Sequence, residues 1–329
     1  ICDCQKTVAG LTGREGQSLL KYVIRRTLIS IPTIVITVSI IFFVMRVLPG
    51  DPALVILGDS ATEEAIARLN EQLGLNMPLW QQYINYLYDL LRLDFGQSLT
   101  TGRPVTELLF SLFPYTLELT FAAILIGTAV GMPIGIIVAR RRGTLTDGLF
   151  RLIALIGISM PAFFLGILLL ISFSLKIPLF PSVGAGEGVV DNLYHLVLPA
   201  LTLGLIEAAL IMRITRSSIL DEINKDYVRT ARAKGVPERV VLLKHILRNI
   251  LIPVVTVIGL NITTLISGAV LTESVFSRPG LGSLAIGSIT NRDYPTLQAC
   301  LVLFGVLVVI VNLLVDLTYS IINPRIRHE

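Results

Sequence analysis

The stretch DYVRTARAKGVPERVVLLKHILRN, residues 226–249, is a basic segment that lies between two long apolar segments. It carries six Lys or Arg residues. Residues 221–234 have a helical composition, and Gly235 is the expected end of that helix. Pro237 is suited to open a second helix, over 237–249. The sequence therefore predicts two helices joined by a Gly-x-Pro corner. The first is rich in small residues that let another surface approach closely, namely Ala231 and Ala233.

The surrounding composition is that of an integral membrane protein. The chain has 329 residues, of which 53% are hydrophobic and 15% are charged, whereas soluble domains contain about 25% charged residues. A spanning helix needs roughly 20 mostly apolar residues. Six segments satisfy this requirement: 27–45, 119–139, 152–175, 196–216, 249–272 and 296–320. The first of them is too long for the apolar region of a signal peptide and lacks a small-residue cleavage site.

The Lys and Arg residues orient these spans. With both termini in the cytoplasm, 20 of the 27 basic residues fall on the cytoplasmic side, as the positive-inside rule requires. The predicted fold class is an all-α integral membrane protein with six transmembrane helices, N-in and C-in. This topology makes residues 226–249 cytoplasmic and places residues 47–115 outside.

The outer loop carries its own helix signals. Ser60-x-x-Glu63 is a capping box and Gly74 a suitable stop, which predicts a helix over 61–73. Pro78 can open a second helix over 78–93, with Trp80, Ile84, Leu87 and Leu91 on one face, and Pro104 can open a third. We therefore expect a helical cap on the outer surface.

These signals divide the chain into segments. The predicted organisation is an unassigned extension (1–19), a first transmembrane helix (20–46), an extracytoplasmic helical loop (47–115) and a transmembrane core of five helices (116–329) that contains the cytoplasmic loop 217–248.

Sequence motifs for chemistry on covalent bonds are missing. There is no G-x-x-x-x-G-K-[ST] to bind ATP, no H-E-x-x-H and no G-x-S-x-G nucleophile elbow. The chain is therefore expected to move something, with energy supplied from elsewhere. From composition alone, the basic loop either sets orientation and lies on anionic lipid or docks a cytoplasmic partner.

A set of distinctive motifs runs along the chain from about Leu20 to Arg327. They are Asp226-Tyr227-Val228-Arg229-Thr230-Ala231-Arg232-Ala233-Lys234-Gly235, His245-x-x-Arg248-Asn249-x-x-x-Pro253, Leu48-Pro49-Gly50-Asp51-Pro52, Asp94-Phe95-Gly96-x-Ser98, Pro161-Ala162-Phe163, Thr215-Arg216-Ser217-Ser218, Thr272-Glu273-x-Val275-Phe276-x-x-Pro279-Gly280-Leu281-Gly282 and Asn323-Pro324-x-Ile326-Arg327. As a set, these motifs resemble those of ABC-importer permeases, and most closely the dipeptide and oligopeptide subfamily, which includes glutathione and nickel permeases.

The sequence departs from the general permease pattern in three places. Where the wider family has E-A-A-x-x-x-G, this chain has Arg229-Thr230-Ala231 followed by Gly235. Pro253 lies farther from that glycine than in the general motif. Both differences are typical of the peptide subfamily. Residues 1–19 match nothing recognised.

The resemblance implies a type I importer permease fold in the bacterial inner membrane and a subunit that is not itself an enzyme. A helix near 228–236 would seat on a separate ATPase, and ATP binding there would drag the spans from inward- to outward-facing. The residues implied in this coupling are Tyr227, Arg229, Thr230, Ala231, Arg232, Ala233, Lys234, Gly235 and Val236. The loop implied to face a substrate-binding protein comprises Arg278, Pro279, Gly280, Leu281 and Gly282; the alternative for it is a Gly/Pro hairpin between two spans.

The implied partners are a second, similar permease, two ABC ATPase subunits that bind the ATP and Mg, a periplasmic or lipid-anchored binding protein, and membrane lipid. Nucleic acid is not expected, and no cofactor is expected on this chain. The implied cargo is a di- or oligopeptide. The same architecture could import glutathione, nickel chelates or another small solute, and the remaining alternative is an intramembrane enzyme or a scaffold.

Two acidic residues lie within predicted spans. Glu207 and Asp316 are candidates for a transport pathway or, in the enzyme alternative, for a catalytic pair. The structural alternative is that each acid forms an interhelical hydrogen bond or salt bridge. The span glycines are interpreted as sites of close helix packing.

Overall fold

The computed structural model describes residues 2–47, 62–72 and 76–322, and within them the chain is helical, with one isolated β-bridge between Gln97 and Pro104. The α-helices are α1 (Cys2–Val47), α3 (Glu63–Gln72), α4 (Leu79–Leu91), α5 (Val105–Arg140), α6 (Leu145–Ser159), α7 (Ala162–Leu170), α8 (Gly188–Glu222), α9 (Asp226–Ala233), α10 (Glu238–Val240), α11 (Leu247–Val275), α12 (Leu281–Thr290) and α13 (Tyr294–Ile322). Two π-helical turns, η1 (Ile171–Lys176) and η2 (Val241–Ile246), follow α7 and α10.

Six spans are accounted for, although one of them is broken. Five described helical stretches are long and apolar enough to cross a membrane, and α6 with α7 makes a sixth if the bent pair counts as one span. The two helices are bent by 104° relative to one another, so the predicted third span over 152–175 is interrupted at Pro161. Pro161 disfavours a helical conformation at the residue before it, and Met160 is extended, with φ −85° and ψ 128°.

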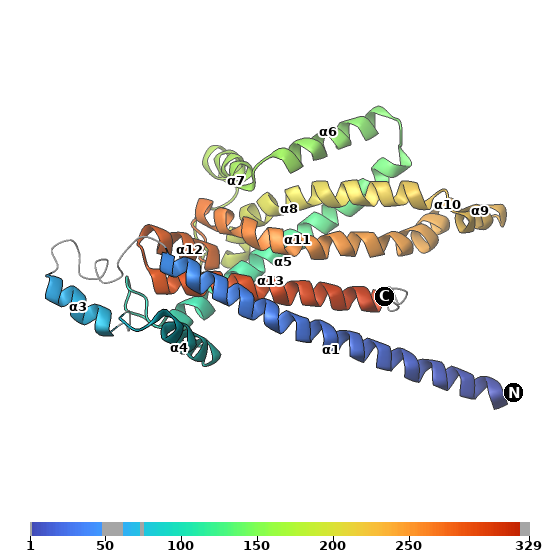
Figure 1. Ribbon diagram of the computed structural model, residues 1–329. Coiled ribbons are helices and arrows are strands. Elements are labelled where there is room, and N and C mark those ends of the chain that lie inside the picture. Colours follow the sequence, from blue (N-terminus) through green and yellow to red (C-terminus); the bar gives the residue numbers. More distant parts are fainter. Residues whose placement is uncertain (1, 48–61, 73–75, 323–329) are drawn as a thin grey trace.

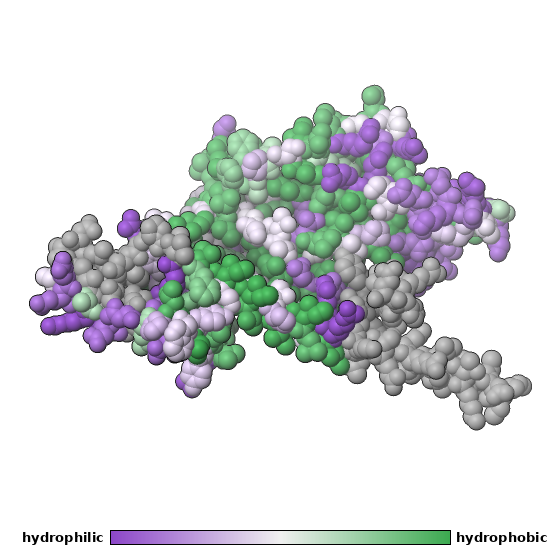
Figure 2. Space-filling view, viewed as in Figure 1, coloured by the Kyte–Doolittle hydropathy of each residue, from purple (hydrophilic) through white to green (hydrophobic). Residues whose placement is uncertain are grey.

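The two ends of the molecule are polar and its middle is apolar. In Figure 1, the first turn of α1 and the last turn of α13 lie at the same end as α9 and α10, whereas α3, α4 and α12 lie at the opposite end. Figure 2 shows hydrophilic residues gathered at these two ends and hydrophobic residues over the helices between them. This arrangement agrees with the predicted N-in, C-in topology.

The closest helix packing joins α5 to α8. A Cβ atom added to Gly131 would lie 2.5 Å from the carbonyl oxygen of Ala208, and one added to Gly135 would lie 2.7 Å from Cβ of Thr215. Gly127 meets Glu207 in the same way. Absent side chains let two helix backbones approach, a common device of membrane helices. The packing interpretation of these glycines is confirmed.

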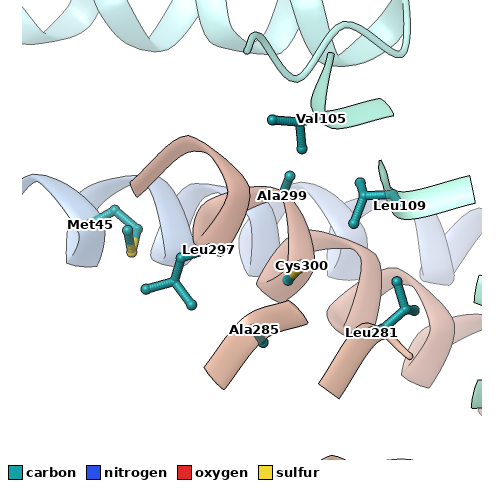
Figure 3. Close-up of a cluster of buried hydrophobic side chains, with 8 residues drawn as sticks. All are labelled: Met45, Val105, Leu109, Leu281, Ala285, Leu297, Ala299 and Cys300. Carbon is teal, nitrogen blue, oxygen red and sulfur yellow. The ribbon is translucent and has the colours of Figure 1, made fainter. Parts of the chain in front are cut away.

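A cluster of buried hydrophobic side chains joins the outer ends of four helices (Figure 3). Figure 3 draws its buried members: Met45 of α1, Val105 and Leu109 of α5, Leu281 and Ala285 of α12, and Leu297, Ala299 and Cys300 of α13. Cys300 is fully buried among apolar side chains, as expected of a cysteine that packs as a small hydrophobe. This cluster packs α12 against the spanning helices α1, α5 and α13.

The outer cap differs from the prediction in one respect. The two expected helices appear as α3 and α4. Pro104 does not open a separate third cap helix, because α5 begins directly after it and continues through Pro114 into the second span. The expected boundary between 115 and 116 therefore lies inside one helix.

Some predicted features cannot be compared with the structure. Ser60, Gly74, the Leu48–Pro52 turn and the Asn323–Arg327 motif lie outside the described residues. Of the unassigned segment 1–19, residues from Cys2 onward are helical and continuous with the first span.

Candidate coupling site at the cytoplasmic face

The cytoplasmic corner begins with a break that the sequence did not predict. α8 ends at Glu222 and α9 starts at Asp226, after Lys225 adopts an extended conformation with φ −72° and ψ 150°. The expected helix over 221–234 is therefore two helices with a turn between them. The turn reorients the chain, so that α9 is a short, separate helix at the end of the bundle (Figure 1).

α9 ends in a Schellman motif, and Gly235 makes the motif possible. The Gly235 amide donates to the Arg232 carbonyl at 2.9 Å, and the Val236 amide donates to the Ala231 carbonyl at 3.2 Å. Gly235 has φ +76°, a left-handed conformation that glycine adopts without the penalty of a Cβ atom. Pro237 then precedes α10 as its N-cap residue. The predicted Gly-x-Pro corner is confirmed in its geometry.

An ion pair links α9 to α10 across this corner. Arg232 donates from Nε and Nη2 to the two carboxylate oxygens of Glu238, at 3.1 and 2.7 Å. These hydrogen bonds to Glu238 raise the pKa of Arg232 above its usual value. Both side chains are exposed, and exposed pairs contribute at most about 1 kcal/mol. The pair orients the two helices more than it stabilises them.

The predicted coupling residues divide into a buried and an exposed set. Ala231 is buried in a cluster with Val241, Ile246 and Ile250, and Tyr227 and Val236 pack against it half-buried. Val228, which was not among the predicted coupling residues, is buried in the same cluster. The exposed set comprises Arg229, Thr230, Arg232, Ala233, Lys234 and Gly235. Of the two small residues expected to admit another surface, Ala233 is exposed, whereas Ala231 packs against its own chain.

A partly buried polar network joins α9 to the spans on either side. The Tyr227 hydroxyl donates to Oε1 of Glu222 at 2.6 Å, and Nδ2 of Asn249 donates to the same oxygen at 3.1 Å. Lys225 holds the other carboxylate oxygen at 2.6 Å. Burial and the bond to Glu222 raise the pKa of Tyr227 to about 12. The hydroxyl therefore stays protonated and remains a donor at physiological pH.

A second polar contact between helices lies near the cytoplasmic face and joins α6 to α8. The carboxylate of Asp147, at the start of α6, accepts from Nε and Nη2 of Arg216 on α8 at 2.8 and 2.9 Å. The Gly143 amide donates to it at 3.0 Å. Such bidentate pairs are among the stronger polar contacts. Asp147 and Glu222 were not among the predicted site residues, because the partners that join them to other helices, Arg216 and Asn249, are distant in sequence.

The loop expected to face a binding protein lies inside the chain. Arg278, Gly280, Leu281 and Gly282 are buried, and Pro279 is half-buried. Arg278 donates from Nη2 to Glu118 at 3.0 Å and to Asn192 at 2.8 Å. These contacts give the segment a structural role at the outer ends of α5 and α8, and its role towards another protein stays a prediction.

The packing of that loop rests on Glu273. Its carboxylate is fully buried and accepts hydrogen bonds from the Thr116 hydroxyl at 2.6 Å and from the amides of Gly282 and Ser283 at 2.8 and 3.1 Å. It thereby supplies the acceptor that the N-terminus of α12 needs. A Cβ atom at Gly280 would lie 2.2 Å from this carboxylate, so this glycine makes room for it.

The two candidate acids of the spans have separate neighbours. Asp316 forms a salt bridge with Arg26 of α1, which is the interhelical contact considered as one alternative. Glu207 is buried against Gly127 of α5, and its Oε1 accepts no hydrogen bond from the residues that the structure describes. Because each acid is engaged with a different helix, the geometry gives no support to a catalytic pair.

The chain is similar to known proteins along most of its length. Two family models match it: "Binding-protein-dependent transport system inner membrane component" over residues 131–328, and the N-terminal component of the same kind of membrane protein over residues 19–120. It is 45% identical over 311 residues to the glutathione transport system permease protein GsiC of Salmonella typhimurium, and this alignment covers 94% of this chain and 100% of the relative. The corresponding protein of Escherichia coli K12 is 44% identical over the same length.

The fold also has a counterpart among solved structures. A chain from an inward-facing conformation of the MetNI methionine ABC transporter superposes with a TM-score of 0.54 and 22% identity, covering 66% of this chain and 96% of that one. The comparisons confirm the importer-permease fold, the inner-membrane location and a transport subunit that is not an enzyme, whose partners include an ATPase and a substrate-binding protein. The chain belongs to the family of inner-membrane permease components of binding-protein-dependent ABC importers.

Proposed function

We propose that this permease translocates small peptides, glutathione among them, and that α9 transmits the work of the ATPase to the spans. The observation that carries the coupling part is the exposed face of α9. This face is basic and contains a small residue, Ala233, and the Schellman corner and the Glu222 network hold it rigidly at the cytoplasmic end. A fixed helix can pass a displacement to α8 and α11, whereas a mobile loop would absorb it.

The cargo is proposed from the relatives. GsiC is named for glutathione transport and aligns along its entire length with this chain. Glutathione is itself a tripeptide, so a peptide importer and a glutathione importer are neighbouring versions of one function. Nickel chelates are the competing cargo.

The assembly is proposed to contain a second permease and two ATPase subunits that bind the ATP and Mg, with each permease offering one helix like α9 to one ATPase. The binding protein would deliver cargo from the side of α3 and α4. Nucleic acid has no part in this assembly.

Uptake into membrane vesicles tests both parts. With the binding protein, a second permease and the ATPases present, labelled dipeptide or glutathione should accumulate in an ATP-dependent manner, and unlabelled nickel chelate should not compete. ATP-dependent accumulation of nickel alone would replace the peptide assignment.

The coupling part is tested by a pair of bulky substitutions. Ala233→Trp should separate ATP hydrolysis from uptake, while Leu145→Trp, at an exposed cytoplasmic position on α6, should leave both unchanged. Unimpaired uptake in Ala233→Trp would remove the coupling role from α9.

A further inference from the structure

The outer helix α4 carries an apolar stripe that no part of the described chain covers. Trp80, Ile84 and Leu91 are 65%, 55% and 86% exposed, and Tyr88 beside them is also exposed. At 100° per residue, these four positions fall within one quarter of the helix circumference. Large exposed apolar surfaces of this kind mark a contact with another molecule or with a membrane.

The rest of α4 is divided between a packed face and a polar face. Tyr83 and Tyr86 pack against Phe42 of α1, with ring centroids 5.4 and 5.2 Å apart. The polar residues Gln81, Gln82, Asn85 and Asp89 lie together on the remaining side of the helix, and Asp89 is the one charged residue in α4. The packed and exposed apolar faces are contiguous, so α4 presents one broad apolar side and one polar side.

The contacts with α1 set the depth of α4 relative to the membrane. The Tyr83 hydroxyl shares a hydrogen bond of 2.5 Å with Ser39, and the apolar span of α1 extends to Arg46. Seven residues of helix rise by about 10 Å. α4 therefore lies beside the last two turns of the span rather than beyond its end. Phe43 of α1, whose ring centroid lies 5.6 Å from that of Tyr83, is itself exposed, as are Ile40 and Val44 at the same depth.

We propose that α4 is an interfacial amphipathic helix that lies in the outer leaflet, with Trp80, Ile84, Tyr88 and Leu91 in contact with lipid. Its aromatic content fits this location, because Trp and Tyr concentrate where the headgroups meet the acyl chains. An apolar face buried in that zone with a polar face toward water is the arrangement of interfacial helices. The occupant is lipid, because the stripe continues the apolar surface of a spanning helix at the same depth. This anchor would hold the outer cap at a fixed height above the bilayer.

The sequence offers a direct probe, since Trp80 is the only tryptophan of the chain. The full chain would be reconstituted into phosphatidylcholine vesicles that contain lipid brominated on its acyl chains, and the emission of Trp80 would be recorded. We expect blue-shifted emission, a loss of intensity that grows with the fraction of brominated lipid, and little quenching by iodide.

Two variants locate the effect on the stripe. Trp80→Phe with Leu91→Trp keeps the probe on the same face and should be quenched by brominated lipid. Trp80→Phe with Asp89→Trp moves it to the opposite face and should be quenched by iodide instead. Quenching of Trp80 by iodide alone would place the stripe in water and overturn the proposal. Quenching by neither agent would show that protein covers the stripe, and would overturn it as well.

Discussion

The Tyr227 hydroxyl and the Glu222 carboxylate, 2.6 Å apart, join the cytoplasmic helix α9 to the end of span helix α8. Asn249, just inside α11, donates to the same carboxylate oxygen. One buried acid thus connects the short helix to both spans that flank it. A displacement of α9 has a direct route into α8 and α11, which is the physical basis of the coupling proposed for this permease.

Removing the Tyr227 hydroxyl should loosen this joint. Tyr227→Phe keeps the ring in its half-buried place but deletes a hydrogen bond to a charged group, a loss of about 1.5–3 kcal/mol. We expect the ATP hydrolysed per peptide imported to rise, while insertion and assembly persist. The ratio is measured from parallel ATPase and uptake assays in vesicles. Ser217→Ala, which removes an exposed hydroxyl bonded within α8 itself, serves as the control, and an equal rise in both variants would count against a special role for the contact between Tyr227 and Glu222.

The corner at Gly235 should depend on backbone conformation rather than on space. A Cβ atom there meets nothing within 4 Å, but φ is +76°. Gly235→Ala should therefore cost about 1–2 kcal/mol through the left-handed conformation alone, and Gly235→Asn should cost less. Gly148 is the matched control, because its added Cβ also meets nothing and it lies in an ordinary helix. Gly148→Ala should be neutral or stabilising by up to about 1 kcal/mol. Thermal unfolding in detergent distinguishes the Gly235→Ala and Gly148→Ala variants, and identical unfolding midpoints for the two would contradict this explanation.

The contact between α5 and α8 should tolerate no side chain at Gly131. A Cβ atom there would lie 2.5 Å from a backbone oxygen, which cannot move without separating the two helices. Gly131→Val should destabilise the fold by about 3 kcal/mol or more. Gly157→Ala, whose Cβ would meet Ala209 at 3.5 Å, is an ordinary contact and should be accepted. The yield and monodispersity of each variant after solubilisation measure the effect. A well-folded Gly131→Val variant would show that α5 and α8 do not pack together at this glycine.

The N-terminus of α12 should depend on Glu273. Glu273→Ala leaves the Thr116 hydroxyl and two amides without their acceptor, and each unsatisfied buried group costs about 1–3 kcal/mol. We expect faster protease cleavage near residues 276–283. Glu107, in an exposed pair with Arg103, provides the comparison, since Glu107→Ala should change stability by less than about 1 kcal/mol. Equal protease resistance of the two variants would argue against the capping role.

The sequence predicted the parts of the fold that depend on local signals. Hydropathy located the spans because a membrane helix must be apolar over its whole length. Gly235 and Pro237 marked the corner because each residue restricts its own backbone. A proline alone does not predict where a spanning helix breaks. Pro161 breaks the third span, whereas Pro133, Pro199 and Pro253 lie within unbroken helices. Packing against neighbouring helices therefore decides whether the helix continues through a proline.

The site was predicted less completely for a similar reason. The exposed face of α9 followed from composition, but the partners that hold it did not, because Glu222 and Asn249 are 27 residues apart. Arg278 was expected in a loop that faces a binding protein, as the family resemblance implied. The structure buries it beside Glu118 and Asn192, partners contributed by other helices that no local pattern reveals.

The central claim, that α9 touches the ATPase, is tested most directly by a photo-crosslinker placed at Ala233 in intact membranes containing the assembled transporter. The account predicts a covalent product with the ATPase, identified by mass, and none from the same crosslinker at Leu145. A crosslink from position 233 to lipid alone, or to a permease chain in place of the ATPase, would contradict it.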